Sequence, residues 1–286
     1  MKKIPVFYNP KMAVLEQQPS PSAQKPKLLV EQWLERGFDI EVIDFEPITR
    51  EDFYTVHDKS HVDDILDVKK PNGMDTLSQE LADSLYWTNA SLLKAAEHAL
   101  KHQIAVSPTS GFHHAEYSEA MGYCTFNGLM VTAQNLLKNR KVKKVGILDC
   151  DQHYGNGTEN IINEYCMEDK ITHITARKSY HPEPKYAFDF FERLPFFLED
   201  FSDCGLLIYQ AGADCHIDDP CGGFLTSKEM SERDRQVFNF CKEKRIPLVW
   251  NLAGGYQEEN IGGIVSIQKV LDLHHATMQE CIRAYL

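Results

Sequence analysis

The chain has 286 residues, of which 43% are apolar, and a formal net charge of -12. This length fits one large α/β domain or two small ones, and the apolar fraction allows a substantial core. The acidic balance argues against direct nucleic-acid binding, because phosphates need basic partners. It fits a cationic small molecule or peptide as ligand, or simply solubility.

The eight cysteines include no Cys-x-x-Cys pair, which is typical of reduced thiols rather than of a disulfide framework. The first apolar run, residues 4–8, is too short for a signal peptide, and no later run approaches the length of a membrane span. We therefore expect a cytoplasmic protein that does not bind membranes. The sequence leaves the oligomeric state open.

Short apolar runs alternate with helical patterns along the chain. The predicted strands are residues 4–8, 39–45, 104–106, 145–148, 171–176, 205–209 and 247–252. The predicted helices are residues 27–36, 60–68, 77–101, 126–137, 158–165, 188–201 and 227–244, with a further helix at the C-terminus. This alternation predicts a single α/β domain over residues 1–286, with a mostly parallel sheet and helices on both faces.

Asp149, Asp151 and His153 alternate at the carboxyl end of the predicted strand 145–148. In an extended chain, positions two apart point the same way. Sites in open α/β sheets form beyond the carboxyl ends of the strands. The spacing favours a metal site, although an Asp-x-Asp pair after a strand also serves as a helix cap.

Two further loops at the same edge add candidate ligands. His113 and His114 follow the strand 104–106 and suit acid–base work or metal binding, or are plain surface residues. Asp214 lies in a predicted glycine-rich loop, 210–223, where it ligates a metal or caps a turn. Together with Asp151 and His153, it would supply the three ligands of a catalytic zinc site with one open position.

Gly254, Gly255 and Tyr256 follow the last predicted strand. Glycines let a backbone approach a ligand closely, and a tyrosine hydroxyl there can donate to a developing oxyanion. A tyrosine after a glycine pair also occurs for packing alone. All four loops with suggestive residues thus belong to one edge of the predicted sheet.

These motifs, in this order, resemble the histone deacetylase superfamily, which includes bacterial deacetylase-like amidohydrolases and acetylpolyamine amidohydrolases and has the arginase–deacetylase fold. They are His-His at 113–114, Asp-x-Asp-x-His-x-Gly-Asn-Gly-Thr at 149–158, Gly-x-Asp and Asp-Pro-x-Gly-Gly within 212–223, and Gly-Gly-Tyr at 254–256. The likeness spans roughly residues 53–256.

The resemblance implies two metal sites. Zinc, with iron(II) as the alternative metal, would be held by Asp151, His153 and Asp214. A structural potassium ion would use the Asp149 carboxylate and the carbonyls of Asp149, Asp151, His153 and Thr175.

The resemblance also implies catalytic roles. His114 would be the general base toward the attacking water, with Asn156 behind it. His113 would be its neighbouring imidazole, oriented by Asp149. Tyr256 would polarise the substrate carbonyl and stabilise the oxyanion.

Gly122 and Tyr123 would line the tunnel for an acyl-lysine-like chain, and Gly254 and Gly255 would border it. The expected activity is zinc-dependent deacetylation of an acetylated amine, either an acetyl-lysine peptide or an acetylpolyamine. The alternatives are a hydrolase of other acyl groups or small amides, and an idle module that binds acyl-lysine.

Three departures from the family pattern put the substrate in doubt. Tyr154 replaces the histidine usual after the metal-binding one. Lys27 stands in for an arginine near the internal channel of relatives. Residues 177–191 lack the usual glycine-rich loop and its aromatic tunnel wall.

Overall fold

A seven-stranded parallel sheet with the order β2-β1-β3-β7-β6-β4-β5 forms the centre of the molecule. The computed structural model describes residues 2–14, 18–261 and 264–286. The strands are β1 (Ile4–Phe7), β2 (Ile40–Ile43), β3 (Ile104–Ser107), β4 (Val145–Asp149), β5 (Ile171–Thr175), β6 (Leu206–Gly212) and β7 (Leu248–Ala253). Every residue of β1, β3, β4, β6 and β7 is buried, as expected where helices cover both faces.

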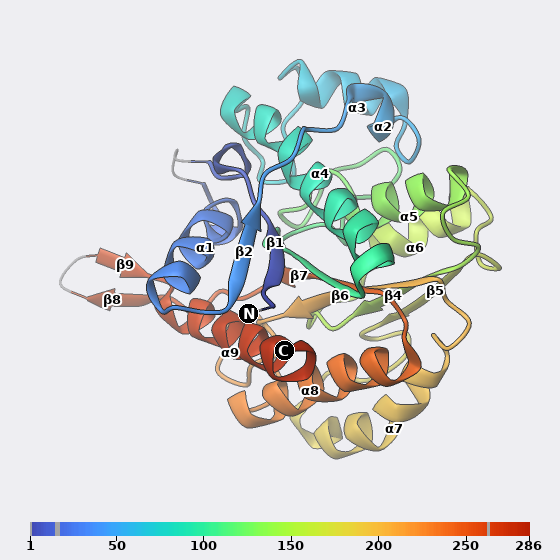
Figure 1. Cartoon of the computed structure of the whole chain (residues 1–286). Helices are drawn as coiled ribbons and strands as arrows, with labels where there is room; N and C mark the ends of the chain where they lie inside the picture. The colour runs from blue at the N-terminus through green and yellow to red at the C-terminus, as the bar shows by residue number, and fades with distance from the viewer. Residues whose placement is uncertain (1, 15–17, 262–263) are drawn as a thin grey trace.

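Helices lie on both faces of this sheet (Figure 1). One layer consists of α1 (Lys25–Glu35), α7 (Ala187–Glu199), α8 (Ser227–Lys244) and α9 (Gln268–Tyr285). The other consists of α4 (Gln79–His102), α5 (Gly128–Lys138) and α6 (Asn156–Glu164), with the short α2 (Arg50–Phe53) and α3 (Lys59–Leu66) beside them. Alternate residues of β6 serve the two layers: Leu207 and Tyr209 the first, Leu206 and Ile208 the second. The predicted α/β architecture is confirmed.

Side-chain caps decide where several helices begin. The Ser78 hydroxyl accepts the Leu81 N–H before α4, and the Asn127 side chain accepts the Met130 N–H before α5. Most predicted boundaries lie within two residues of the observed ones. Among the helices in the described ranges, none is both long and apolar enough to cross a membrane.

Two parts of the sequence prediction were wrong. Residues Gln210 to Gly212, assigned to a loop, extend β6, because they pair with β7 in register Gln210↔Asn251 and Gly212↔Ala253. Backbone pairing in the middle of a sheet outweighs the polar and glycine residues here. After the last strand of the sheet, where the sequence predicts a loop over 253–260 and then the C-terminal helix, the chain forms an antiparallel hairpin of β8 (Glu259–Ile261) and β9 (Ile264–Ser266).

Candidate functional site

The candidate site lies beyond the carboxyl ends of β3, β4, β6 and β7, which are neighbours in the middle of the sheet. The chain passes from β3 to β4 across the positions of β7 and β6, so connections leave the sheet in opposite directions here. Such a switch point opens a crevice in which ligands bind. The four loops singled out in the sequence follow these four strands.

The three predicted zinc ligands converge beyond β4 and β6. His153 Nδ1 is 3.0 Å from Asp151 Oδ1 and 3.0 Å from Asp214 Oδ2. The donor atoms of all three side chains lie within 4.8 Å of one another. Two of these residues, Asp151 and Asp214, are buried, and His153 is partly exposed.

The electrostatics of this cluster fit a divalent cation. Burial, and then the charge of Asp151, raise the pKa of Asp214 to about 7. Hydrogen bonds to both carboxylates raise the pKa of His153 to about 10. Two carboxylates in a buried place repel each other unless a positive charge lies between them. One nitrogen and two oxygen donors around such a space are a donor set that zinc accepts.

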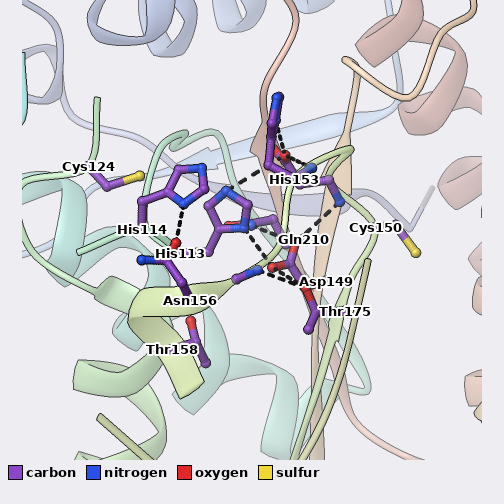
Figure 2. A network of polar contacts seen from close by, with 12 residues as sticks. His113, His114, Cys124, Asp149, Cys150, His153, Asn156, Thr158, Thr175 and Gln210 are labelled. Carbon is purple, nitrogen blue, oxygen red and sulfur yellow. Dashed lines mark hydrogen bonds and ion pairs between the residues drawn. The ribbon is translucent and has the colours of Figure 1, made fainter. Parts of the chain in front are cut away.

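His113 and His114 lie side by side, with ring centres 4.0 Å apart, but have different partners (Figure 2). His113 Nδ1 is 2.7 Å from Asp149 Oδ2. His114 Nδ1 is 2.6 Å from Asn156 Oδ1, and the amide nitrogen of Asn156 donates to Glu116 Oε1 at 2.8 Å. Because the Asn156 oxygen can only accept, His114 carries its proton on Nδ1 and leaves Nε2 free to take another.

The two histidines differ accordingly in basicity. Burial alone would lower the pKa of His113, but Asp149 and Asp151 outweigh it and raise the pKa to about 9. Burial, followed by the charge of His113, lowers the pKa of His114 to about 4. Paired groups whose surroundings separate their pKa values are a mark of acid–base sites.

Asp149 is surrounded by donors. Gln210 Nε2 donates to its Oδ1 at 2.8 Å, and the Asp151 N–H donates to the same oxygen at 3.2 Å. The Thr175 hydroxyl is 3.4 Å from Oδ2, beside His113. Gln210, which extends β6, was missed in the sequence because that position was assigned to a loop.

Most of the groups predicted to hold potassium already have protein partners. The Tyr180 hydroxyl is 3.1 Å from the Asp149 carbonyl oxygen and 3.4 Å from that of Asp151. The Thr175 carbonyl accepts the Ser179 N–H at 2.9 Å. The donor set therefore does not fit the predicted ion, and neither Tyr180 nor this arrangement was foreseen.

The loop after β7 packs directly against Asp214, one of the predicted metal ligands. A Cβ atom on Gly254 would lie 2.2 Å from the Asp214 carboxyl carbon, so only glycine allows this approach. The Tyr256 N–H donates to Asp219 Oδ2 at 2.8 Å. Burial, with the charges of Asp151 and Asp214, raises the pKa of Tyr256, so its hydroxyl stays protonated and can donate.

Gly122 and Tyr123 lie on the other side of the histidine pair. A Cβ atom on Gly122 would be 2.5 Å from the His114 ring. The Tyr123 side chain is exposed, and its ring centre lies 5.9 Å from that of Tyr256. The two tyrosines thus flank the approach to the site from loops 133 residues apart, by the difference of their numbers.

The lysine at the base of the site is Lys25, and the prediction of Lys27 was wrong. The Lys25 ammonium donates to the Gly254 carbonyl and lies 3.4 Å from the Ser110 hydroxyl. The Lys27 side chain is 44% exposed and faces Glu31 at 4.0 Å. Helix α1 begins at Lys25, and two residues turn a helix by about 200°, so the two lysines point to opposite sides.

The spacing of the buried residues in α1 was a signal for Lys25. Lys25 shares a buried helical face with Leu29 and Trp33, at spacings of four residues. Burial lowers its pKa to about 8, against the opposing effect of Asp214 and other carboxylates. A buried lysine in line with an apolar stripe is a signal that the predicted helix, begun at residue 27, concealed.

Comparisons with known proteins identify relatives of this chain. Histone deacetylase HDA1 of Saccharomyces cerevisiae is 31% identical over 155 residues, which is 47% of this chain and 21% of that protein. Histone deacetylase 2 of Arabidopsis thaliana is 29% identical over 185 residues, 58% of this chain and 48% of that protein. The chain thus spans about half or less of the length of these two relatives.

The fold is shared with a solved structure, an acetylpolyamine aminohydrolase from Burkholderia pseudomallei. It superposes with a TM-score of 0.74 at 16% identity and covers 98% of each chain. The sequence profile of the histone deacetylase domain matches residues 20–188 and 177–269, which together are most of the chain. Sequence, fold and the order of the site loops therefore lead to one conclusion: the chain belongs to the histone deacetylase family.

Proposed function

We propose that this chain is a metal-dependent amidohydrolase that removes the acetyl group from an acetylated amine of the acetyl-lysine or acetylpolyamine type. The observation that carries the proposal is His153 Nδ1 at 3.0 Å from both Asp151 and Asp214. The ring of His114 lies next to this cluster, 6.0 Å from that of His153 between centres. Family membership supports amide hydrolysis as the reaction.

Asp151, His153 and Asp214 would hold the metal, zinc or alternatively iron(II). When bound, such an ion polarises the amide carbonyl and makes a water molecule more acidic. The protein supplies the remaining steps through its own side chains.

His114 accepts the proton of the attacking water at Nε2, because its Nδ1 is already protonated and donates a hydrogen bond to Asn156 Oδ1. The water oxygen bonds to the carbonyl carbon, and the carbonyl π electrons move onto its oxygen. The Tyr256 hydroxyl donates a hydrogen bond to this oxyanion. As the C–N bond breaks, the proton on His114 Nε2 passes to the leaving amine, which yields acetic acid and a free amine.

His113 and Asp149 act through position and charge. Asp149 orients His113 by the 2.7 Å contact, and His113 in turn packs against the general base. Gly122 and Tyr123 would contact the chain of the substrate. Because all four site loops leave one sheet, we also infer that residues 1–286 work as a single catalytic domain.

The test combines metal analysis with a substrate panel. Purified protein should contain about one equivalent of metal and should cleave acetyl-lysine peptides or acetylpolyamines. Chelation should remove both properties, and added Zn²⁺ should restore them. Tyr256→Phe should lower kcat by about 10²–10³-fold, because one oxyanion donor is lost.

Tyr165→Phe is the matched control, since this exposed tyrosine follows α6 away from the site. Faster turnover of longer acyl groups or small amides would favour the broader hydrolase. Normal metal content without turnover of any substrate would contradict an enzyme and favour a binding module. Full activity in Tyr256→Phe would contradict the assigned mechanism.

A further inference from the structure

Two backbone carbonyls at the end of β4 accept hydrogen bonds from a side-chain hydroxyl group. The Tyr180 hydroxyl is within 3.4 Å of the carbonyl oxygens of both Asp149 and Asp151. With one proton, it bridges the two acceptors. The Tyr180 side chain is buried, and its ring packs edge-on against Phe190, with centres 4.9 Å apart. The core therefore fixes the hydroxyl in this place.

Tyr180 reaches this position through a tight turn after β5. The Ser179 N–H donates to the Thr175 carbonyl at 2.9 Å, and the Arg177 N–H donates to the Tyr180 carbonyl at 2.7 Å. Arg177 itself has a left-handed φ of 65°. The turn lies in the segment 177–191, where the sequence departs from the family pattern. This divergent segment therefore places the Tyr180 hydroxyl next to the backbone of the site.

A second side chain faces the carboxylate of Asp149. His173, on β5, has a buried ring between two acids: Nδ1 is 2.6 Å from Glu159 Oε1, and Nε2 is 3.9 Å from Asp149 Oδ2. Lys178 pairs with Glu159 at 2.6 Å and reaches the surface. Basic and acidic groups therefore alternate from solvent to Asp149.

The backbone of Gly155 also lies beside the Asp149 carboxylate and the His173 ring. A Cβ atom there would lie 2.7 Å from Asp149 Oδ2 and 3.2 Å from His173 Nε2. The backbone of the metal-site loop thus runs directly over the contact between the ring and the carboxylate. Asp149 thus has Tyr180 at its carbonyl and His173 and Gly155 beside its carboxylate.

We propose that Tyr180 and His173 together replace the monovalent cation expected beside Asp149, so that the chain folds and works without potassium. Tyr180 donates to two of the four carbonyls that the ion would bind, those of Asp149 and Asp151, and the His173 ring faces the carboxylate. Both are positioning residues, because they act on His113 and on the metal loop through Asp149. This role in catalysis rests on the proposed function, whereas the independence of stability from potassium does not.

The experiment measures thermal unfolding and activity in 0.1 M KCl, NaCl and choline chloride (about equal ionic strength), for protein first dialysed against choline chloride. Wild type should have the same Tm and rate in all three salts. Tyr180→Phe keeps the ring but frees the two carbonyls, and His173→Ala opens the space beside Asp149. Either variant should gain a potassium requirement, with Tm rising by about 5 °C at a hundredfold excess over Kd.

Tyr186→Phe is the matched control, because this tyrosine lies in the same segment without a contact to Asp149, and it should behave as wild type. A saturable rise of the wild-type Tm with potassium, absent in choline, would overturn the proposal. Variants that lose stability equally in every salt would also count against it. The Tm comparison needs no turnover, so it decides the inference even if the proposed activity fails.

Discussion

Two buried carboxylates at the end of β4, Asp149 and Asp151, lie only two residues apart but have different neighbours. Burial alone raises the pKa of Asp149, but the His113 and His173 rings outweigh it and hold that pKa well below its usual range. The charge of His113 and a hydrogen bond to His153 outweigh burial at Asp151 too and lower its pKa, but the adjacent Asp214 has a pKa raised to about 7. Two imidazole rings face the single carboxylate of Asp149, whereas the two carboxylates of Asp151 and Asp214 share the ring of His153. This contrast supports the proposal that the region of Asp151 and Asp214 holds a metal.

The largest effect is expected when a proposed ligand is removed from the region of Asp151 and Asp214. Asp214→Asn should abolish metal binding and lower activity by about 10³-fold or more, because several kcal/mol of Lewis-acid stabilisation are lost. The same change should make the metal-free protein more stable at pH 8, since it relieves repulsion with Asp151. Metal analysis and urea unfolding of chelated protein provide the two measurements. A metal-free variant less stable than wild type would contradict the charge imbalance.

The equivalent change at Asp149 should instead lower the stability of the protein. Asp149→Asn removes the charge that His113 and His173 face, so the free energy of unfolding should fall by about 3–5 kcal/mol. Activity should fall by about 10–100-fold through the loss of His113 orientation. Urea unfolding and steady-state kinetics test this. Equal effects of the two Asn variants on the metal-free protein would remove the distinction between the regions.

Lys25, whose ammonium interacts with the charges of Asp214 and Asp151, provides a smaller test. Lys25→Met removes the donor to the Gly254 carbonyl and should lower activity by about tenfold, as expected for about 1.5 kcal/mol of hydrogen bonding to a charged group. Lys27→Met, on the exposed face of the same helix, should leave kcat/KM unchanged. Comparable losses in both variants would show that α1, rather than the buried ammonium, is responsible.

The smallest effect concerns His57, a buried histidine that is uncharged at neutral pH. His57 Nδ1 is 2.8 Å from the Glu116 carbonyl, and its Nε2 accepts the Asn127 N–H at 2.9 Å. Burial lowers its pKa to about 3, below the unfolded value of about 6.5. The unfolded chain therefore takes up the proton first, and stability is lost as the pH falls from about 6.5 toward 3.

His57→Gln should reduce this slope by about one proton in urea unfolding between pH 7.5 and 5. His181→Gln, at an exposed position, is the control. A slope identical to wild type in the His57 variant would show that other groups govern the acid sensitivity.

The sequence predicted the architecture well because alternating apolar runs and caps are local signals. It also brought Asp151, His153 and Asp214 to one place, since parallel strands end at the same edge. Gln210 was missed because the pairing of β6 with β7, and not the local pattern, sets where β6 ends.

Tyr180 and His173 were missed for a different reason. Their contacts with Asp149 join positions 31 and 24 residues apart, by the difference of their numbers, and depend on the register of β4 against β5. No local spacing encodes such a contact. Lys25 was misassigned because an error of two residues in a helix start reverses the face of a side chain.

The place of β7 in the sheet has a consequence for how the site comes into being. It is the last strand of the sheet in sequence, yet it lies between β3 and β6, at the centre. Before it is made, the chain holds two separate groups of strands, one with the His113–His114 loop and the other with the metal ligands. The proposed general base and the proposed metal ligands can meet only after β7 has joined them, so the growing chain has no complete site until β7 has been made.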